Sequence, residues 1–164
     1  MNHLRIAASL LLLMITPAFA QSDAKSTFEH LKSLNGTWEG KASNGKPVKL
    51  VFRSSSGGSA LVSEIMGDEN MISVFHMDND RILMTHYCAA GNQPRMQASS
   101  SPDGKTVTFT FVDGTNMSSP TVGHMNALVI SMPDADHHAE DWTFVQDGKE
   151  TKEHFEAVRT KAAM

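Results

Sequence analysis

Apolar and polar side chains alternate in short runs along most of the chain, and turn-forming residues separate the runs. In residues 47–54 the apolar positions include Val48, Leu50 and Phe52, and the opposite face carries lysine and arginine. This period of two is typical of a β-strand with one buried face. By this criterion we predict ten strands, at residues 36–43, 47–54, 60–66, 70–77, 81–88, 94–99, 106–112, 123–132, 138–146 and 151–159.

The dipeptides between the runs, such as Asn44-Gly45 and Asp103-Gly104, are those that favour tight hairpin turns. Ten short strands with this spacing predict a meandering antiparallel barrel or sandwich. Residues 26–34 instead show apolar residues at helical spacing. We therefore expect an all-β fold with a short N-terminal helix that closes one end.

Two predicted strands carry polar residues on a face that is otherwise apolar. In the first, this face carries Ile82, Met84, His86 and Cys88. In the second, it carries His124, Asn126, Leu128, Ile130 and Met132. If both faces point inward, the interior is apolar at one end and polar at the other. Such an interior is suited to holding an amphipathic small molecule.

The first twenty residues have the pattern of a secretory signal peptide. Arg5 precedes an apolar run, and Pro17, Ala18 and Ala20 follow it. The run is too short to span a bilayer, which takes ~20 residues, so we expect no membrane span. Cleavage near Ala20 would leave residues 21–164 as a single domain, exported to the periplasm or secreted.

Charge and cysteine content narrow the choice of partners. The chain has 14 cationic and 18 acidic residues, and removal of Arg5 leaves 13 against 18, a net charge of −5. A mildly acidic surface without a basic stripe disfavours binding to phosphate backbones, so we expect no nucleic-acid partner. Cys88 is the only cysteine, which excludes an intrachain disulfide. The sequence carries no signal for the oligomeric state.

Two segments resemble a known group of proteins. Gly36-Thr37-Trp38, at the start of the first predicted strand, resembles the start of lipocalin-like barrels of the calycin group. Residues 85–88 and 91–96 resemble exported bacterial lipocalin-like proteins of unassigned function. The resemblance spans roughly residues 28–160. It implies an antiparallel barrel of eight to ten strands in which Trp38 closes the bottom, although the paired cysteines of secreted lipocalins are missing.

We therefore predict an exported binding protein for a small hydrophobic or amphipathic ligand held inside a barrel. The polar end of the ligand would be fixed by His86, Asn92, Arg95 and His124. Arginine recognises a carboxylate well, so an anionic head group is one hypothesis. The alternative is that Arg95 pairs with a local acid. The complete predicted ligand-binding set is Trp38, Met84, His86, Tyr87, Asn92, Gln93, Arg95, Met96, His124 and Asn126.

The same residues allow two other functions. A small enzyme would use His86 or His124 as a general base and Cys88 as a nucleophile. A haem or metal carrier would use imidazole and thiolate as ligands, although the spacing of a dedicated metal site is missing and no cofactor is predicted. The alternative is a purely structural role, in which the histidines are hydrogen-bonded in a partly polar interior and Cys88 is a small buried hydrophobic residue.

Two further patterns have a structural explanation as well as a functional one. The many methionines would adapt to varied ligands or fill an ordinary core. The run of acids and histidines at 134–141 attracts metals, but a solvated turn explains it equally well. We expect adventitious metal binding there and no dedicated site.

Overall fold

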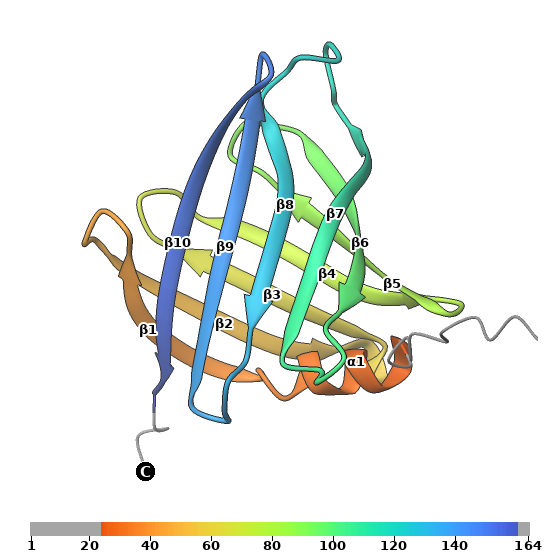
Figure 1. The fold of residues 1–164 in the computed structure, drawn as a ribbon, viewed down its shortest axis with the longest axis vertical. Coiled ribbons are helices and arrows are strands. Elements are labelled where there is room, and N and C mark those ends of the chain that lie inside the picture. The colour runs from red at the N-terminus through yellow and green to blue at the C-terminus, as the bar shows by residue number, and fades with distance from the viewer. Residues whose placement is uncertain (1–23, 161–164) are drawn as a thin grey trace, which may run out of the picture.

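A computed structural model describes residues 24–160, in which ten antiparallel strands close into a barrel with one short helix beside it (Figure 1). The predicted signal peptide lies outside the described residues. The elements are α1 (Ala24–Lys32), β1 (Gly36–Ala42), β2 (Pro47–Ser55), the 3₁₀ turn η1 (Ser56–Gly58), β3 (Ala60–Met66), β4 (Met71–Asp78), β5 (Arg81–Tyr87), β6 (Gln93–Ser100), β7 (Thr106–Thr115), β8 (His124–Ser131), β9 (His137–Gln146) and β10 (Lys149–Arg159).

The topology is a simple meander. Each strand pairs with the next one in sequence, and β1 closes the ring by pairing with both β2 and β10. Sequential antiparallel pairing needs only short connections, which the turn dipeptides supply. The prediction of an all-β antiparallel barrel with a short N-terminal helix is confirmed.

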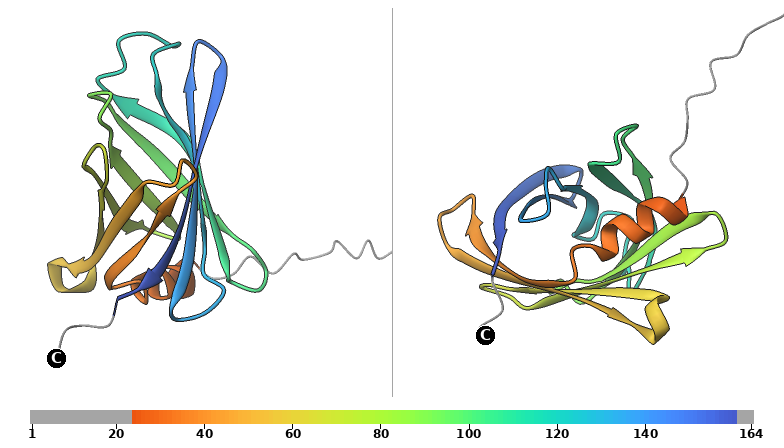
Figure 2. Two further views of the ribbon diagram at one scale, coloured as in Figure 1. Left: turned by 90° about the vertical axis from the view of Figure 1, so that its left-hand side faces the viewer. Right: turned by 90° about the horizontal axis from the view of Figure 1, so that it is seen from below.

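The barrel is flattened, so that two walls face each other across the core. Strands β7 to β10 form one wall, and β2 to β5 cross behind them at a steep angle (Figure 1). Phe75 of β4 and Phe109 of β7 meet edge to face, with ring centroids 5.3 Å apart. Helix α1 lies across one end, seen from below in Figure 2, and contributes Phe28 and Leu31 to the core. The middle of the barrel is therefore packed with side chains.

Trp38 lies fully buried at the α1 end. Its indole Nε1 donates a hydrogen bond of 2.7 Å to the carbonyl of Leu34, and the Arg159 guanidinium lies 4.1 Å from its ring centroid. Arg159 in turn donates to the carbonyls of Ser33 and Asn35. These contacts tie β1, β10 and the segment after α1 together and close this end.

The opposite end, called here the open end, carries the turns β1–β2, β3–β4, β5–β6 and β9–β10 and the loop between β7 and β8. Helix α1 lies at the other end of the barrel. Within residues 24–160, no helix combines the length and apolarity needed to cross a membrane.

Candidate functional site

His86 faces the interior near the open end of β5. Ile82, Met84 and His86 alternate along the strand and are all nearly or fully inaccessible. Cross-strand pairing places Ser73 of β4 opposite His86, and Ser73 Oγ shares a 2.9 Å hydrogen bond with His86 Nδ1. The Trp142 ring of β9 lies 4.7 Å away, centroid to centroid. His86 Nε2 has no hydrogen-bond partner.

Burial lowers the pKa of His86 to about 4, because desolvation disfavours the charged imidazolium. The ring is therefore neutral at neutral pH. A neutral imidazole donates from one nitrogen and accepts at the other. Since Nδ1 is engaged by Ser73, Nε2 is the ring nitrogen left without a hydrogen-bond partner.

Strand β9 adds a polar column that the sequence analysis missed. His138, Glu140 and Trp142 are buried and share the inward face. Trp142 Nε1 donates a 2.8 Å hydrogen bond to Glu140 Oε2, and Glu140 Oε1 lies 3.6 Å from His138 Nε2. Neither ring nitrogen of His138 has a hydrogen-bond partner. We call Ser73, His86, His138, Glu140 and Trp142 the interior polar cluster.

The signal for this column was present in the chain as the alternation of residues 138, 140 and 142 within a predicted strand. Its charged composition favoured a solvated turn instead. The structure corrects that interpretation in part, because Asp134 and His137 are exposed and pair at 2.9 Å, whereas His138 and Glu140 turn inward.

A cavity of about 390 Å³ lies at the open end, and no residue of the interior polar cluster lines it. Apolar inward-facing residues such as Val48, Ile65 and Phe155 form its floor, and charged residues form its rim. We call it the mouth pocket; it is lined by Ala42, Asn44, Lys46, Pro47, Val48, Ile65, Gly67, Asp68, Glu69, Met71, Glu153 and Phe155.

The mouth pocket and the interior polar cluster are neighbours along two strands. Met71, which lines the pocket, is two residues from Ser73 on the same face of β4. Phe155, which also lines it, pairs across β9 and β10 with Glu140. Two residues that line the pocket are therefore neighbours of Ser73 and Glu140, although no residue of the interior polar cluster lines the pocket itself.

Several predicted site residues lie inside the barrel without all converging on one point. Met84 and Met96 are fully buried. Asn92 is buried at the β5–β6 turn, where its amide Nδ2 donates 2.7 Å to the carbonyl of Gly123 while its Oδ1 has no partner. His124 Nδ1 donates 2.8 Å to the carbonyl of Val122, and its ring lies 4.6 Å from that of Phe111.

The predicted uninterrupted face of residues 123–132 needs correction. A register shift between Met125 and Ala127 breaks the alternation of β8, so Met125 packs against the core and Asn126 is only half-buried at the irregularity. Trp38 belongs to the opposite, closed end. Neither residue lines the mouth pocket.

Three other predicted residues also lie away from the interior. Tyr87 is 50% exposed, as its position next to inward-facing His86 requires. Gln93 accepts a 2.7 Å hydrogen bond from the Thr115 hydroxyl at the surface. Arg95 is exposed and gives Asp113 a two-point ion pair, with Nε donating at 2.6 Å. Arg95 therefore has a local acid partner and does not reach the mouth pocket.

Cys88 is half-buried beside the β5–β6 turn. Burial raises the pKa of its thiol, and the nearby charge of Glu69 adds to the rise. The thiolate is the nucleophilic form, and the hydrogen bonds of His86 and His124 go to other groups. The described contacts thus supply neither an activated sulfur nor a base for it.

Within residues 24–160, no three His, Cys, Asp or Glu side chains gather as metal ligands.

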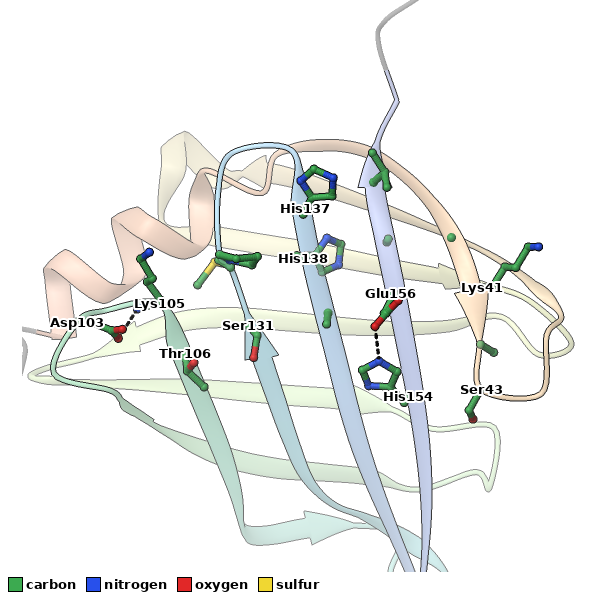
Figure 3. Close-up of a pocket in the computed structure, with 17 residues that line it drawn as sticks. Lys41, Ser43, Asp103, Lys105, Thr106, Ser131, His137, His138, His154 and Glu156 are labelled. Carbon is green, nitrogen blue, oxygen red and sulfur yellow. Dashed lines mark hydrogen bonds and ion pairs between the residues drawn. The ribbon is translucent and has the colours of Figure 1, made fainter.

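A second cavity, of about 900 Å³, is a groove on the outside of the barrel (Figure 3). It runs over β1, β10, β9, β8 and β7. Side chains alternate along β10, and Phe155 and Ala157 face the core. The alternate residues His154 and Glu156 therefore face this groove. His154 Nδ1 lies 2.7 Å from Asp141 Oδ1, and this pairing raises the pKa of His154. The exposed histidines of the groove are thus already paired with acids.

Comparison with known proteins identifies the fold. No family model matches the chain, and no curated protein matches it. The crystal structure of Rv2717c from M. tuberculosis is similar, with 14% identity and a TM-score of 0.57, over 82% of this chain and 98% of that one. A protein of unknown function from the DUF3598 family of Nostoc punctiforme is similar over 79% of this chain and 49% of its own, with 11% identity and a TM-score of 0.55. At these identities the likeness concerns the fold alone.

Proposed function

We propose that this protein is an exported, lipocalin-like binding protein that holds a small amphipathic molecule at the open end of its barrel. The apolar part of the ligand packs on the floor of the mouth pocket, and its polar end points toward the interior polar cluster. Export rests on the signal-peptide pattern of residues 1–20.

The observation that carries the proposal is the buried, unpartnered Nε2 of His86 on β5, next to strand β4, whose Met71 lines an apolar-walled pocket. Buried polar atoms in folded proteins are nearly always hydrogen-bonded to protein, water or ligand. A ligand that satisfies such atoms gains affinity from hydrogen bonding. Removal of its apolar surface from water adds roughly 25 cal/mol per Å², before the costs of association.

A neutral fluorescent probe, N-phenyl-1-naphthylamine, tests the pocket directly. We expect saturable fluorescence enhancement with one site per barrel. The substitution Met71→Trp fills the mouth pocket and should weaken probe binding by roughly tenfold or more, the equivalent of about 1.4 kcal/mol.

Ile72→Trp is the matched control, because Ile72 is the next residue of the same strand and is exposed on the outer face. It should leave probe binding unchanged. The proposal fails if no saturable binding occurs, or if the two tryptophan substitutions have the same effect.

Haem or metal carriage was the alternative function, and it has a direct test. Native mass spectrometry and an absorption spectrum of protein purified from its own host separate the functions. A co-purifying organic molecule without iron or another metal supports the proposal. A bound haem or a stoichiometric metal ion would overturn it.

A further inference from the structure

The interior of the barrel contains a buried acid without a strong cationic partner. Glu140 is 2% exposed. Within residues 24–160, His138 is the one basic side chain within 4.0 Å of its carboxylate. The buried polar residues of this part of the chain are Thr27, Ser63, Ser73, His86, Asn92, His124, His138 and Glu140, and they include no lysine or arginine.

The groups around Glu140 offer its carboxyl group few polar contacts. Trp142 supplies one neutral hydrogen bond. His138, whose side chain is fully buried, approaches only to 3.6 Å, and both of its ring nitrogens lack hydrogen-bond partners. A buried carboxylate is costly unless it is paired and hydrogen-bonded. A cation that reached Glu140 would remove this cost.

Aromatic rings favour the same kind of ligand. Phe155 pairs with Glu140 across the strands and lines the mouth pocket, and Trp142 follows on the inward face of β9. The faces of aromatic rings attract cations, the more so when the cation is desolvated.

The charge of the mouth pocket points in the same direction. Its lining contains one cationic side chain, Lys46, and three acidic ones, Asp68, Glu69 and Glu153. The net charge of the lining is therefore 1 − 3 = −2. Lys46 is already paired with Asp68. An acidic pocket mouth attracts cations and repels anions. Arg95, the residue predicted to receive an anionic head group, is paired with Asp113 outside.

We infer that the ligand is a cationic amphiphile, an alkylammonium-type amine whose head group enters through the mouth pocket and pairs with Glu140. The inference rests on the proposed function and specifies its ligand class. The alkyl part occupies the mouth pocket, and the ammonium donates a hydrogen bond to the Glu140 carboxylate.

Three probes that differ only in the head group test this inference: decylamine, decanol and decanoate, used below their micelle-forming concentrations at pH 7. We expect isothermal titration calorimetry to show decylamine binding roughly tenfold or more tighter than decanol, with decanoate the weakest, since a tenfold preference needs only about 1.4 kcal/mol. Equal or tighter binding of decanol or decanoate would overturn the inference while leaving the proposed function intact. If none of the three binds, the proposed function fails together with it.

The variant Glu140→Gln locates the head group. It should lower decylamine affinity by roughly tenfold and leave decanol affinity unchanged. The matched control is Glu156→Gln, because Glu156 lies on the outer face of the neighbouring strand and is exposed; this variant should bind all three probes like the parent. Unchanged decylamine affinity in a folded Glu140→Gln protein would contradict the assignment. If that variant does not fold, the head-group comparison on the unmodified protein still decides the question.

Discussion

At the scale of single residues, the most informative side chain is His86, which is held neutral by burial. Its ring meets Ser73 on one side and Trp142 on another. Because the barrel wall excludes water from this ring, its protonation is coupled to folding. The stability of the protein should therefore depend on pH in a direction that can be stated.

Folding lowers the pKa of His86 from 6.5 to about 4, so the unfolded chain binds the proton first as the pH falls. This residue's contribution is intact above about pH 6.5 and is lost as the pH falls toward 4. The full loss amounts to about 3 kcal/mol. Urea unfolding at pH 7 and pH 4.5 should show most of this loss in the parent protein and a clearly smaller one in His86→Gln.

His154 provides the control for this pH experiment. Its pKa is raised by Asp141, so its contribution is present at low pH and is lost as the pH rises through the raised value. His154→Gln should therefore retain the acid loss of the parent protein. The same acid loss in His86→Gln as in the parent would show that His86 is not the group responsible.

Arg95 gives a second residue-scale prediction. Its guanidinium is exposed and paired with Asp113, and an exposed ion pair stabilises a fold little. Arg95→Ala should leave both the free energy of unfolding and the affinity for N-phenyl-1-naphthylamine nearly unchanged. A tenfold loss of probe affinity would instead restore the role first predicted for this residue.

At the scale of elements, closure of the barrel depends on a close approach of β1 and β10. A Cβ atom at Gly40 would lie 1.8 Å from the carbonyl oxygen of Glu156 and 2.8 Å from the Cα of Ala157. Both neighbours are backbone atoms, so they cannot move without shifting the strand. Glycine at position 40 therefore sets how tightly the first and last strands pair.

Gly40→Ala should destabilise the barrel by about 3 kcal/mol, at the upper end of what forced overpacking costs. Urea unfolding measures this change. Gly67→Ala is the matched control, because no atom lies within 4 Å of a Cβ added there. Equal stability of the two alanine variants would mean that the β1–β10 contact is looser than described.

The strands were predictable because their alternation is a local property of the sequence. The run with Val48, Leu50 and Phe52 is β2 almost to the residue, and its apolar positions are the buried ones. The same alternation turns Tyr87 away from the interior, because it is next to His86, so its place in the predicted ligand-binding set was wrong. Asn126 could not be placed in this way, because the register shift in β8 depends on its pairing with β9.

The site was predictable only in part. The alternation from Ile82 predicted that His86 lies on the inward face. The partners of that ring come from β4 and β9, and no single segment of the sequence shows that these strands come together. Glu140 was missed because a charged residue in a polar run is usually solvated. Its burial depends on the opposite wall of the barrel, which a single strand does not reveal.

At the scale of the whole molecule, the barrel offers two cavities that differ in kind. The larger groove lies outside and is lined by exposed side chains such as His137 and His154. The smaller mouth pocket lies at the open end and is lined in part by Met71 and Phe155, which neighbour residues of the interior polar cluster. The larger volume favours the groove as the ligand site. The buried polar atoms without hydrogen-bond partners favour the mouth pocket, because a ligand that pairs with them gains affinity.

The histidine side chains distinguish these two locations in one experiment. Ring-nitrogen NMR spectra of ¹⁵N-histidine-labelled protein, recorded during a titration with decylamine, report on His86 inside and on His137 and His154, which line the outer groove. We predict saturable shifts of the His86 signals, with those of His137 and His154 unchanged. Shifts confined to His137 and His154 would place the ligand in the outer groove and contradict binding inside the barrel.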